Sequence, residues 1–155
     1  MSAGTWKIYA KAKKYIGAGT ITLGAGVFKM SLHRVSASAA ILVLSTRSTF
    51  ASIPGEISAR GGYAAGGRNL VPATAQWTVG ASAKQYKFTQ TTIGLVFTAS
   101  GSSLSNIKYC LVRNSTGAGA GKVLMFCTLS TAAFTITSPN TLTIQPAATG
   151  FFTLA

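Results

Sequence analysis

The sequence predicts a mainly β protein, an antiparallel β-sandwich of jelly-roll type with one short amphipathic helix near the N-terminus. From Ser36 onward, short β-branched and aromatic runs alternate with clusters of Gly, Ser, Asn and Pro, and no helical period is sustained. The 155 residues are 48% apolar, enough for the core of a single domain over residues 1–155. Eleven such runs exceed what one flat sheet usually carries, so two packed sheets are expected. The runs are residues 20–23, 27–33, 41–45, 76–79, 86–89, 93–98, 107–113, 123–129, 133–137, 141–145 and 151–154.

Residues 5–16 depart from the β pattern and are predicted to form the helix. Thr5 can cap its start and Gly17 can end it. On a 3.6-residue wheel the apolar residues share one side and a lysine stripe lies on the opposite side. The apolar side would therefore dock by packing, and the lysine side would be presented at the surface. The apolar side holds Ile8, Tyr9, Ala12, Tyr15 and Ile16; the stripe holds Lys7, Lys11 and Lys14, with Lys13 nearer the apolar edge beside Trp6.

Three loops are singled out by their composition. Small residues at 114–121 separate two apolar runs of equal length, 107–113 and 123–129, which predicts a β-hairpin. Pro139 lies in a short turn between two further strands, where position i+1 of the turn suits it. The glycine-rich segment 61–67 precedes Arg68 but lacks the GxxxxGK[ST] spacing of a phosphate-binding loop, so it is not predicted to be one.

Charge restricts the function more than any motif does. Glu56 is the single acidic residue against fourteen Lys and Arg, giving a formal charge of +13 at pH 7. Chemistry that needs paired carboxylates is therefore excluded, as are Ca²⁺ or Mg²⁺ sites built from several carboxylates. A protein with such a large positive charge attracts nucleic acid, anionic lipid or an acidic protein surface.

Membrane insertion, secretion and disulfide stabilisation find little support. The longest apolar stretches are far shorter than the ~20 residues of a spanning helix, and the lysines among the first residues interrupt any signal-peptide core. Cys110 and Cys127 lie in apolar β-like runs and are expected to be buried thiols.

An enzyme or a metal protein is not predicted. His33 is the one histidine and Glu56 the one carboxylate that could orient it, and no GxSxG elbow surrounds a serine. One His and two Cys sixteen residues apart have no metal-ligand spacing, so neither a metal nor a cofactor is expected. His33 is predicted to be a structural or surface histidine, and Glu56 to pair locally with Arg60, four residues on.

Nucleic-acid binding is the main charge-based alternative. Lysines neutralise phosphates and aromatic rings stack on exposed bases, and both residue types interleave at residues 6–11 and 84–88. However, the other basic residues are scattered from Lys29 to Lys122, and no nucleic-acid-binding motif is present. We therefore expect nucleic acid to be a less favoured partner than protein.

The order of segments resembles a family, the small virion proteins of tailed bacteriophages that decorate or cement the capsid or belong to the tail. The chain differs from that pattern in having a single acidic residue where relatives carry several. The resemblance implies a structural protein without catalytic residues. It rests on YIG (15–17), ITL (21–23), VFKMSLH (27–33), EISARGGYAAGG (56–67), IKYCLV (107–112), NTLTI (140–144) and GFFTL (150–154).

The expected function is therefore that of a non-enzymatic virion component, a cement or decoration protein that binds and stabilises the major capsid shell. Its partners would be the major capsid protein or other virion proteins, with copies forming a homo-oligomer on a particle assembled in the host cytoplasm. The alternatives are a genome-contacting coat protein, or a tail, neck or receptor-binding component in which Tyr63 is the main loop aromatic. The predicted partner-binding residues are Trp6, Lys7, Lys11, Lys13, Lys14, Lys84 and Lys87.

Overall fold

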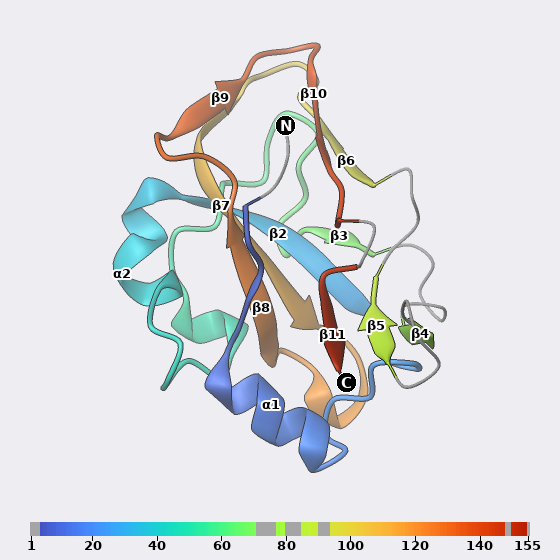
Figure 1. Ribbon diagram of the computed structural model, residues 1–155. Coiled ribbons are helices and arrows are strands. Elements are labelled where there is room, and N and C mark those ends of the chain that lie inside the picture. The colour runs from blue at the N-terminus through green and yellow to red at the C-terminus, as the bar shows by residue number, and fades with distance from the viewer. Residues whose placement is uncertain (1–3, 71–76, 80–84, 90–93, 148–149, 155) are drawn as a thin grey trace.

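A computed structural model describes residues 4–70, 77–79, 85–89, 94–147 and 150–154. It is mainly β, with 40% strand against 16% helix, and its paired strands are antiparallel, as the sequence predicts (Figure 1). The strands form a six-stranded sheet, a two-stranded sheet and a three-stranded sheet.

The six-stranded sheet is the centre of the molecule. Its path runs β1-β8-β7-β2-β3, and β9 pairs with the first part of β7. The predicted hairpin is confirmed, because β7 and β8 pair antiparallel with Cys110 opposite Cys127. The bounds are β1 Lys7–Ile8, β2 Phe28–Arg34, β3 Arg68–Asn69, β7 Leu104–Asn114, β8 Val123–Thr128 and β9 Phe134–Ile136.

The two smaller sheets contribute side chains to the same hydrophobic core as the six-stranded sheet. Phe28 of β2 meets Phe88 of β5 edge-on at 5.0 Å between ring centroids. Phe88 also contacts the rings of Phe151 and Phe152, which joins the three-stranded sheet to the core. The bounds are β4 Trp77–Val79, β5 Tyr86–Phe88, β6 Leu95–Thr98, β10 Thr141–Ile144 and β11 Phe152–Leu154, with β6 paired to β10 and β5 between β4 and β11.

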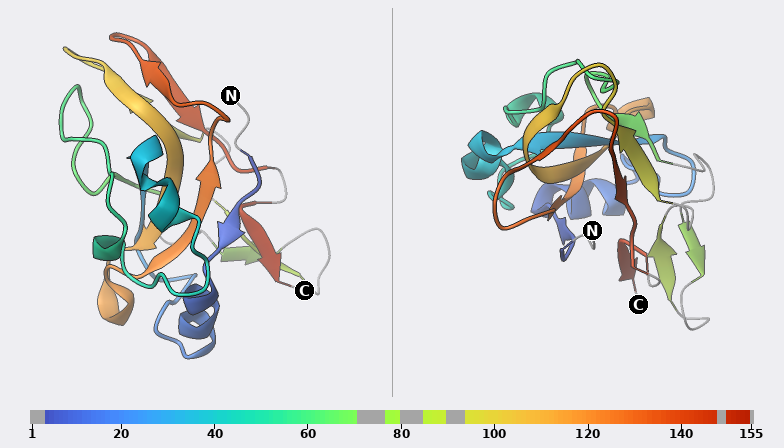
Figure 2. Two further views of the ribbon diagram at one scale, coloured as in Figure 1. Left: turned by 90° about the vertical axis from the view of Figure 1, so that its left-hand side faces the viewer. Right: turned by 90° about the horizontal axis from the view of Figure 1, so that it is seen from above.

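One face of the six-stranded sheet is covered by residues 35–57, which contain short helices instead of strands. These are η1 Val35–Ala37, α2 Ser38–Ile41 and η2 Phe50–Ser52, and the left panel of Figure 2 shows α2 in front of the sheet. Tyr109 and Ser38 share a hydrogen bond of 2.6 Å between their hydroxyls, and the Phe50 ring lies edge-on to His33. The sheet is therefore buried on both faces.

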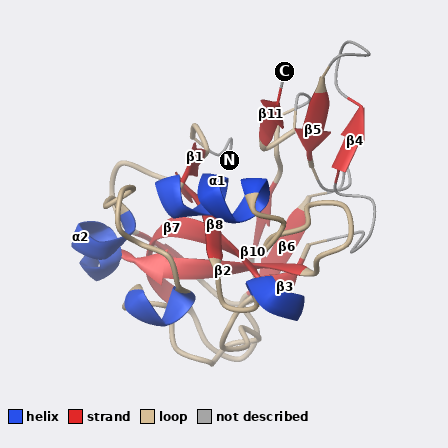
Figure 3. Ribbon diagram, turned by 90° about the horizontal axis from the view of Figure 1, so that it is seen from below, coloured by secondary structure: helices blue, strands red, loops and turns tan. Residues whose placement is uncertain are grey.

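The predicted helix is present but starts later than expected. α1 runs Ala10–Gly17 with Tyr9 at its N-cap, and Figure 3 shows it across the end of the sheet. Lys7 and Ile8 instead extend the sheet, opposite Phe126 and Met125 of β8. Placing them on the helix was wrong, because the open edge of β8 offers these residues backbone hydrogen-bond partners that a first helical turn would lack.

Two of the predicted strands are wrong. In residues 20–23 the alternate side chains Ile21 and Leu23 are buried in the core, as in a strand. The backbone, however, forms hydrogen bonds within the turn after α1, because the N–H groups of Thr20 and Ile21 both donate to the Tyr15 carbonyl. Residues 41–45 continue from α2 into a turn. Neither segment has a neighbouring strand to pair with among the described residues, and in residues 41–45 only Ile41 is buried, whereas Leu42 and Val43 are exposed.

Smaller differences concern turns and short strands. Pro139 follows a cis peptide bond and occupies position i+2 of the 137–140 turn, which is closed by a hydrogen bond from the Asn140 N–H to the Thr137 carbonyl. The prediction that Pro139 occupies position i+1 was therefore wrong. Both β1 and β3 were missed, since two-residue strands carry no periodicity. Residues 76 and 93, the ends of two predicted strands, lie outside the described residues.

Candidate functional site

The one arrangement that resembles a catalytic pair is fully buried. Ser31 Oγ lies 3.0 Å from His33 Nε2, and both residues are 0% exposed on the face of β2 beneath the 35–57 segment. Burial lowers the pKa of His33 to about 4, and the nearby Pro54 carbonyl raises it by less. A neutral imidazole without access to solvent packs the core, which agrees with the structural role predicted for His33.

Glu56 does not orient His33. Its Oε1 accepts hydrogen bonds of 2.6 Å from the Tyr63 hydroxyl and from the Gly66 N–H, and Tyr63 Oη accepts one from the Leu32 N–H. Burial, followed by the hydrogen bond to Glu56, raises the pKa of Tyr63. The carboxylate thus fastens the glycine-rich loop 61–67 to β2.

Two expectations about this loop are wrong. Arg60 does not pair with Glu56, because its guanidinium donates to Ser105 Oγ at 3.0 Å instead. Tyr63 is 5% exposed and so is not the surface aromatic that a receptor site would need. Sequence spacing could not show either fact, since the loop folds back onto β2 through contacts distant along the chain.

The cysteines are free thiols that face each other across the β7–β8 pair. Cys110 and Cys127 are both 0% exposed, as predicted. Burial raises the pKa of Cys110, whereas the hydrogen bond from Cys110 lowers that of Cys127, whose thiol also donates to the Gly4 carbonyl at 3.1 Å. Within the described residues, no three His, Cys, Asp or Glu side chains gather as metal ligands.

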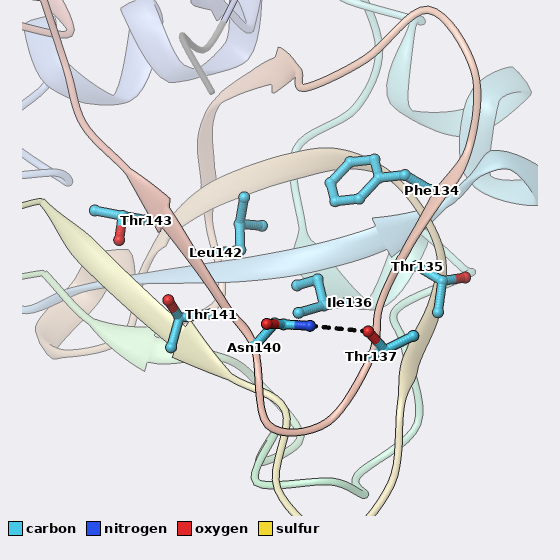
Figure 4. A pocket seen from close by; sticks show the side chains of 8 residues that line it. All are labelled: Phe134, Thr135, Ile136, Thr137, Asn140, Thr141, Leu142 and Thr143. Carbon is cyan, nitrogen blue, oxygen red and sulfur yellow. Dashed lines mark hydrogen bonds between the residues drawn. The ribbon is translucent and has the colours of Figure 1, made fainter.

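Three clefts lined wholly by described residues contain no ionisable side chain. The largest, about 390 Å³, lies between β9 and β10 at the point where the chain passes from one sheet to another (Figure 4). Threonine hydroxyls and the side chains of Phe134, Ile136 and Leu142 line it, and Asn140 Nδ2 donates to Thr137 Oγ1 at 2.9 Å. Such linings offer no acid, base or nucleophile activated by a neighbour.

The predicted partner-binding residues divide into three groups. Lys11, Lys13 and Lys14 are exposed on α1, opposite the buried Ala12. Trp6 is half-buried, edge-on to Phe151 at 4.7 Å, and Lys7 is exposed on β1, so neither belongs to the helix. Lys87 is half-buried on β5 in the three-stranded sheet, and Lys84 lies outside the described residues.

Lys122, which was not among the predicted residues, extends the basic surface of α1. Its Nζ lies 5.2 Å from the centre of the Tyr15 ring, so the β7–β8 loop places a fourth ammonium beside the helix. We call Lys11, Lys13, Lys14 and Lys122 the α1 surface. The sequence could not predict that Lys122 belongs to this surface, because only the fold brings residue 122 close to residue 15.

No protein-family model, characterised protein or solved structure matches this chain. Within the described part of the chain, no helix has the length and apolar character needed to cross a membrane.

Proposed function

We propose that this protein is a non-enzymatic structural component of a virion, a capsid cement or decoration protein whose sheets form a jelly-roll-like sandwich. One observation carries the proposal. The single carboxylate side chain, Glu56, accepts two hydrogen bonds inside the molecule, while Lys11, Lys13 and Lys14 are exposed together on α1. The outer surface therefore presents side-chain charge that is almost entirely positive, suited to an acidic partner.

The chemistry of the described residues supports binding over catalysis. The Ser31–His33 pair is buried, Glu56 fastens a loop, and the described clefts lack ionisable groups. What α1 offers is a group of exposed ammonium groups on a helix whose other side is fixed by Tyr9 and Ala12. Such a surface speeds and orients docking on an acidic shell, and apolar contacts must then hold the complex.

The experiment that tests this function is a binding titration with capsids. Purified protein would be titrated onto particles of the encoding virus prepared without this chain, at ionic strengths between ~50 and ~200 mM. We expect saturable binding that weakens with salt, and a weaker salt dependence for the K11Q/K13Q/K14Q triple variant. An absence of binding at every ionic strength would overturn the proposal.

The genome-contacting alternative is separated by a parallel titration with nonspecific duplex DNA. Counterion release predicts a salt slope that grows with the number of phosphates contacted. If the protein bound DNA more tightly than capsids at physiological salt, the result would favour the alternative in which the basic surface contacts the packaged genome. We expect the reverse order of affinities, because the lysines of α1 belong to a docked helix instead of a flexible, charge-dense arm.

A further inference from the structure

We propose that the outward side of residues 35–43 is an apolar anchor that docks on another virion protein, one whose contact surface is apolar at the centre and carries carboxylates at its rim. The anchor consists of Val35, Ala39, Leu42 and Val43, which we call the α2 patch. The inference rests on the proposed function and names the surface through which it would act.

The α2 patch is an exposed face at helical spacing. The chain turns continuously through η1 and α2, so Val35, Ala39 and Leu42, at i, i+4 and i+7, lie on one side. Val35 is 43% exposed, Leu42 50% and Val43 36%. The opposite side is already in the core, with Ala37, Ala40 and Ile41 buried. The fold therefore uses these outward side chains only in part.

The sequence around the patch is unusual for a surface. Residues 35–46 contain no charged side chain in a protein with fourteen basic residues. Among the described residues, one other large apolar side chain is comparably exposed, Tyr86 at 47%, and its ring stacks on Trp77 at 5.8 Å. A contiguous apolar group without such an internal partner marks an interaction site.

The charges that flank the patch indicate the partner. Arg34 precedes it and Arg47 follows it; each guanidinium donates to a neutral oxygen, Ser58 Oγ and the Ser52 carbonyl respectively. No carboxylate in the described residues neutralises either, since Glu56 bonds to Tyr63 and Gly66. A second copy would offer these arginines no carboxylate side chain other than Glu56, which is already hydrogen-bonded, whereas a partner with carboxylates at its rim would complement them.

The segment that carries the patch is linked to the start of α1. The Tyr9 hydroxyl donates to the Ile41 carbonyl at 3.0 Å, and the Ala10 N–H donates to the Leu44 carbonyl at 2.9 Å, so residues 41–44 hold the start of α1. A stable interface buries roughly 800 Å² on each partner, more than four side chains supply. The lysines of the α1 surface would therefore have to contribute to the same interface.

The test compares Leu42→Ser with Tyr86→Ser, a control that removes an equally exposed apolar side chain elsewhere. Each purified variant would be titrated onto capsids that lack this chain, with circular dichroism confirming the fold. We expect L42S to bind about tenfold more weakly with an unchanged salt slope, because the lost contact is apolar. Y86S should bind like the parent.

The other outcomes separate the two proposals. If the parent binds capsids and L42S binds equally well, the α2 patch is not the anchor, although the proposed function stands. If the parent does not bind at all, the proposed function fails and the anchor fails with it. If sedimentation shows a dimer of the free protein that L42S dissociates, the occupant is a second copy and the heterologous partner is wrong.

Discussion

The two helical segments linked by the Tyr9–Ile41 and Ala10–Leu44 hydrogen bonds use their apolar residues in opposite ways. α1 turns Ala12 inward, where it is 0% exposed, and presents lysines to solvent. The segment 35–43 buries Ala37 and Ile41 on one side and still presents Leu42, half exposed, on the other. Burial therefore explains the composition of α1 but not that of the α2 patch, for whose outer residues we propose a partner outside the chain.

The same comparison assigns different tasks to the two surfaces. Exposed lysines act at a distance, and salt screens them beyond ~10 Å at 0.1 M ionic strength. Apolar side chains act on contact and are insensitive to such screening. In our account the α1 surface therefore governs how fast and in which orientation the protein docks, while the α2 patch governs how long it stays.

The largest expected effect follows from breaking the junction between the two segments. Tyr9 is fully buried, its ring packs on Phe126 at 5.6 Å, and its hydroxyl donates to the Ile41 carbonyl. Replacing Tyr9 with Ala should lower the free energy of unfolding by about 3–5 kcal/mol, because it leaves a cavity and an unpaired carbonyl. Chemical denaturation measures this loss; a change below ~1 kcal/mol would show that the junction is not what fixes α1.

At low pH, residues 35–57, which cover one face of the sheet and carry the α2 patch, should unfold locally before α1 does. His33 lies beneath this cover against Phe50, and its folded pKa of about 4 is below the ordinary 6.5. The unfolded chain therefore binds the proton first, so stability present above pH 6.5 falls as the pH drops toward 4, by roughly 3 kcal/mol in total.

Hydrogen exchange between pH 6.5 and 4 checks this prediction after correction for the intrinsic rate. Amides of residues 35–57 should lose protection before those of α1. His33→Gln should remove much of the pH dependence of unfolding over the same range. Equal loss of protection in both segments, or an unchanged profile in H33Q, would contradict the assignment of this titration to His33.

An intermediate effect tests the inward side of α1. Ala12 has no exposed surface, so Ala12→Leu would force a larger side chain against β8. We expect a loss of about 1–3 kcal/mol in thermal or chemical unfolding. Lys13→Leu, on the outward side of the same helix, is the matched control and should change stability by less than ~0.5 kcal/mol.

The smallest effect is expected at the α2 patch itself. Leu42→Ser should change the free energy of unfolding of the isolated protein by no more than about 0.5 kcal/mol, since half of the side chain already contacts water. So small a change in the free energy of unfolding is what we expect for a side chain that acts in binding a partner and not in stabilising the fold. A loss of ~2 kcal/mol or more would indicate that Leu42 belongs to the core and would remove the contrast with α1.

Much of the fold could be predicted because alternation and turn residues report burial directly. Strands β2, β7 and β8 and the hairpin between the last two follow from apolar runs bounded by glycine and asparagine. The wrong strands at 20–23 and 41–45 have the same apolar character but no partner strand. The start of α1 was misplaced because pairing with β8 outweighs the helical pattern at Lys7 and Ile8.

The candidate site was predictable only in part. The helical spacing predicted Lys11 and Lys14 on the outward side of the helix, but it also placed Lys7 there and put Lys13 nearer the apolar edge. Lys7 lies on β1, Lys13 is exposed, and Lys122 joins the helix only through the fold. The outward exposure of Leu42 was hidden because an apolar run at residues 41–45 predicts a buried strand, and sequence alone does not distinguish a core run from an interface run. Glu56 was expected beside Arg60, yet the loop carries Tyr63 and Gly66 to it instead.

Cryo-electron microscopy of the particle that contains this chain would show directly where the protein binds. We expect density outside the major shell at many symmetry-related positions, with α1 and the α2 patch facing the shell and carboxylates opposite Arg34 and Arg47. Density on the inner wall against the genome, density restricted to the tail, or a decorating subunit whose α2 patch faces solvent would contradict this expectation.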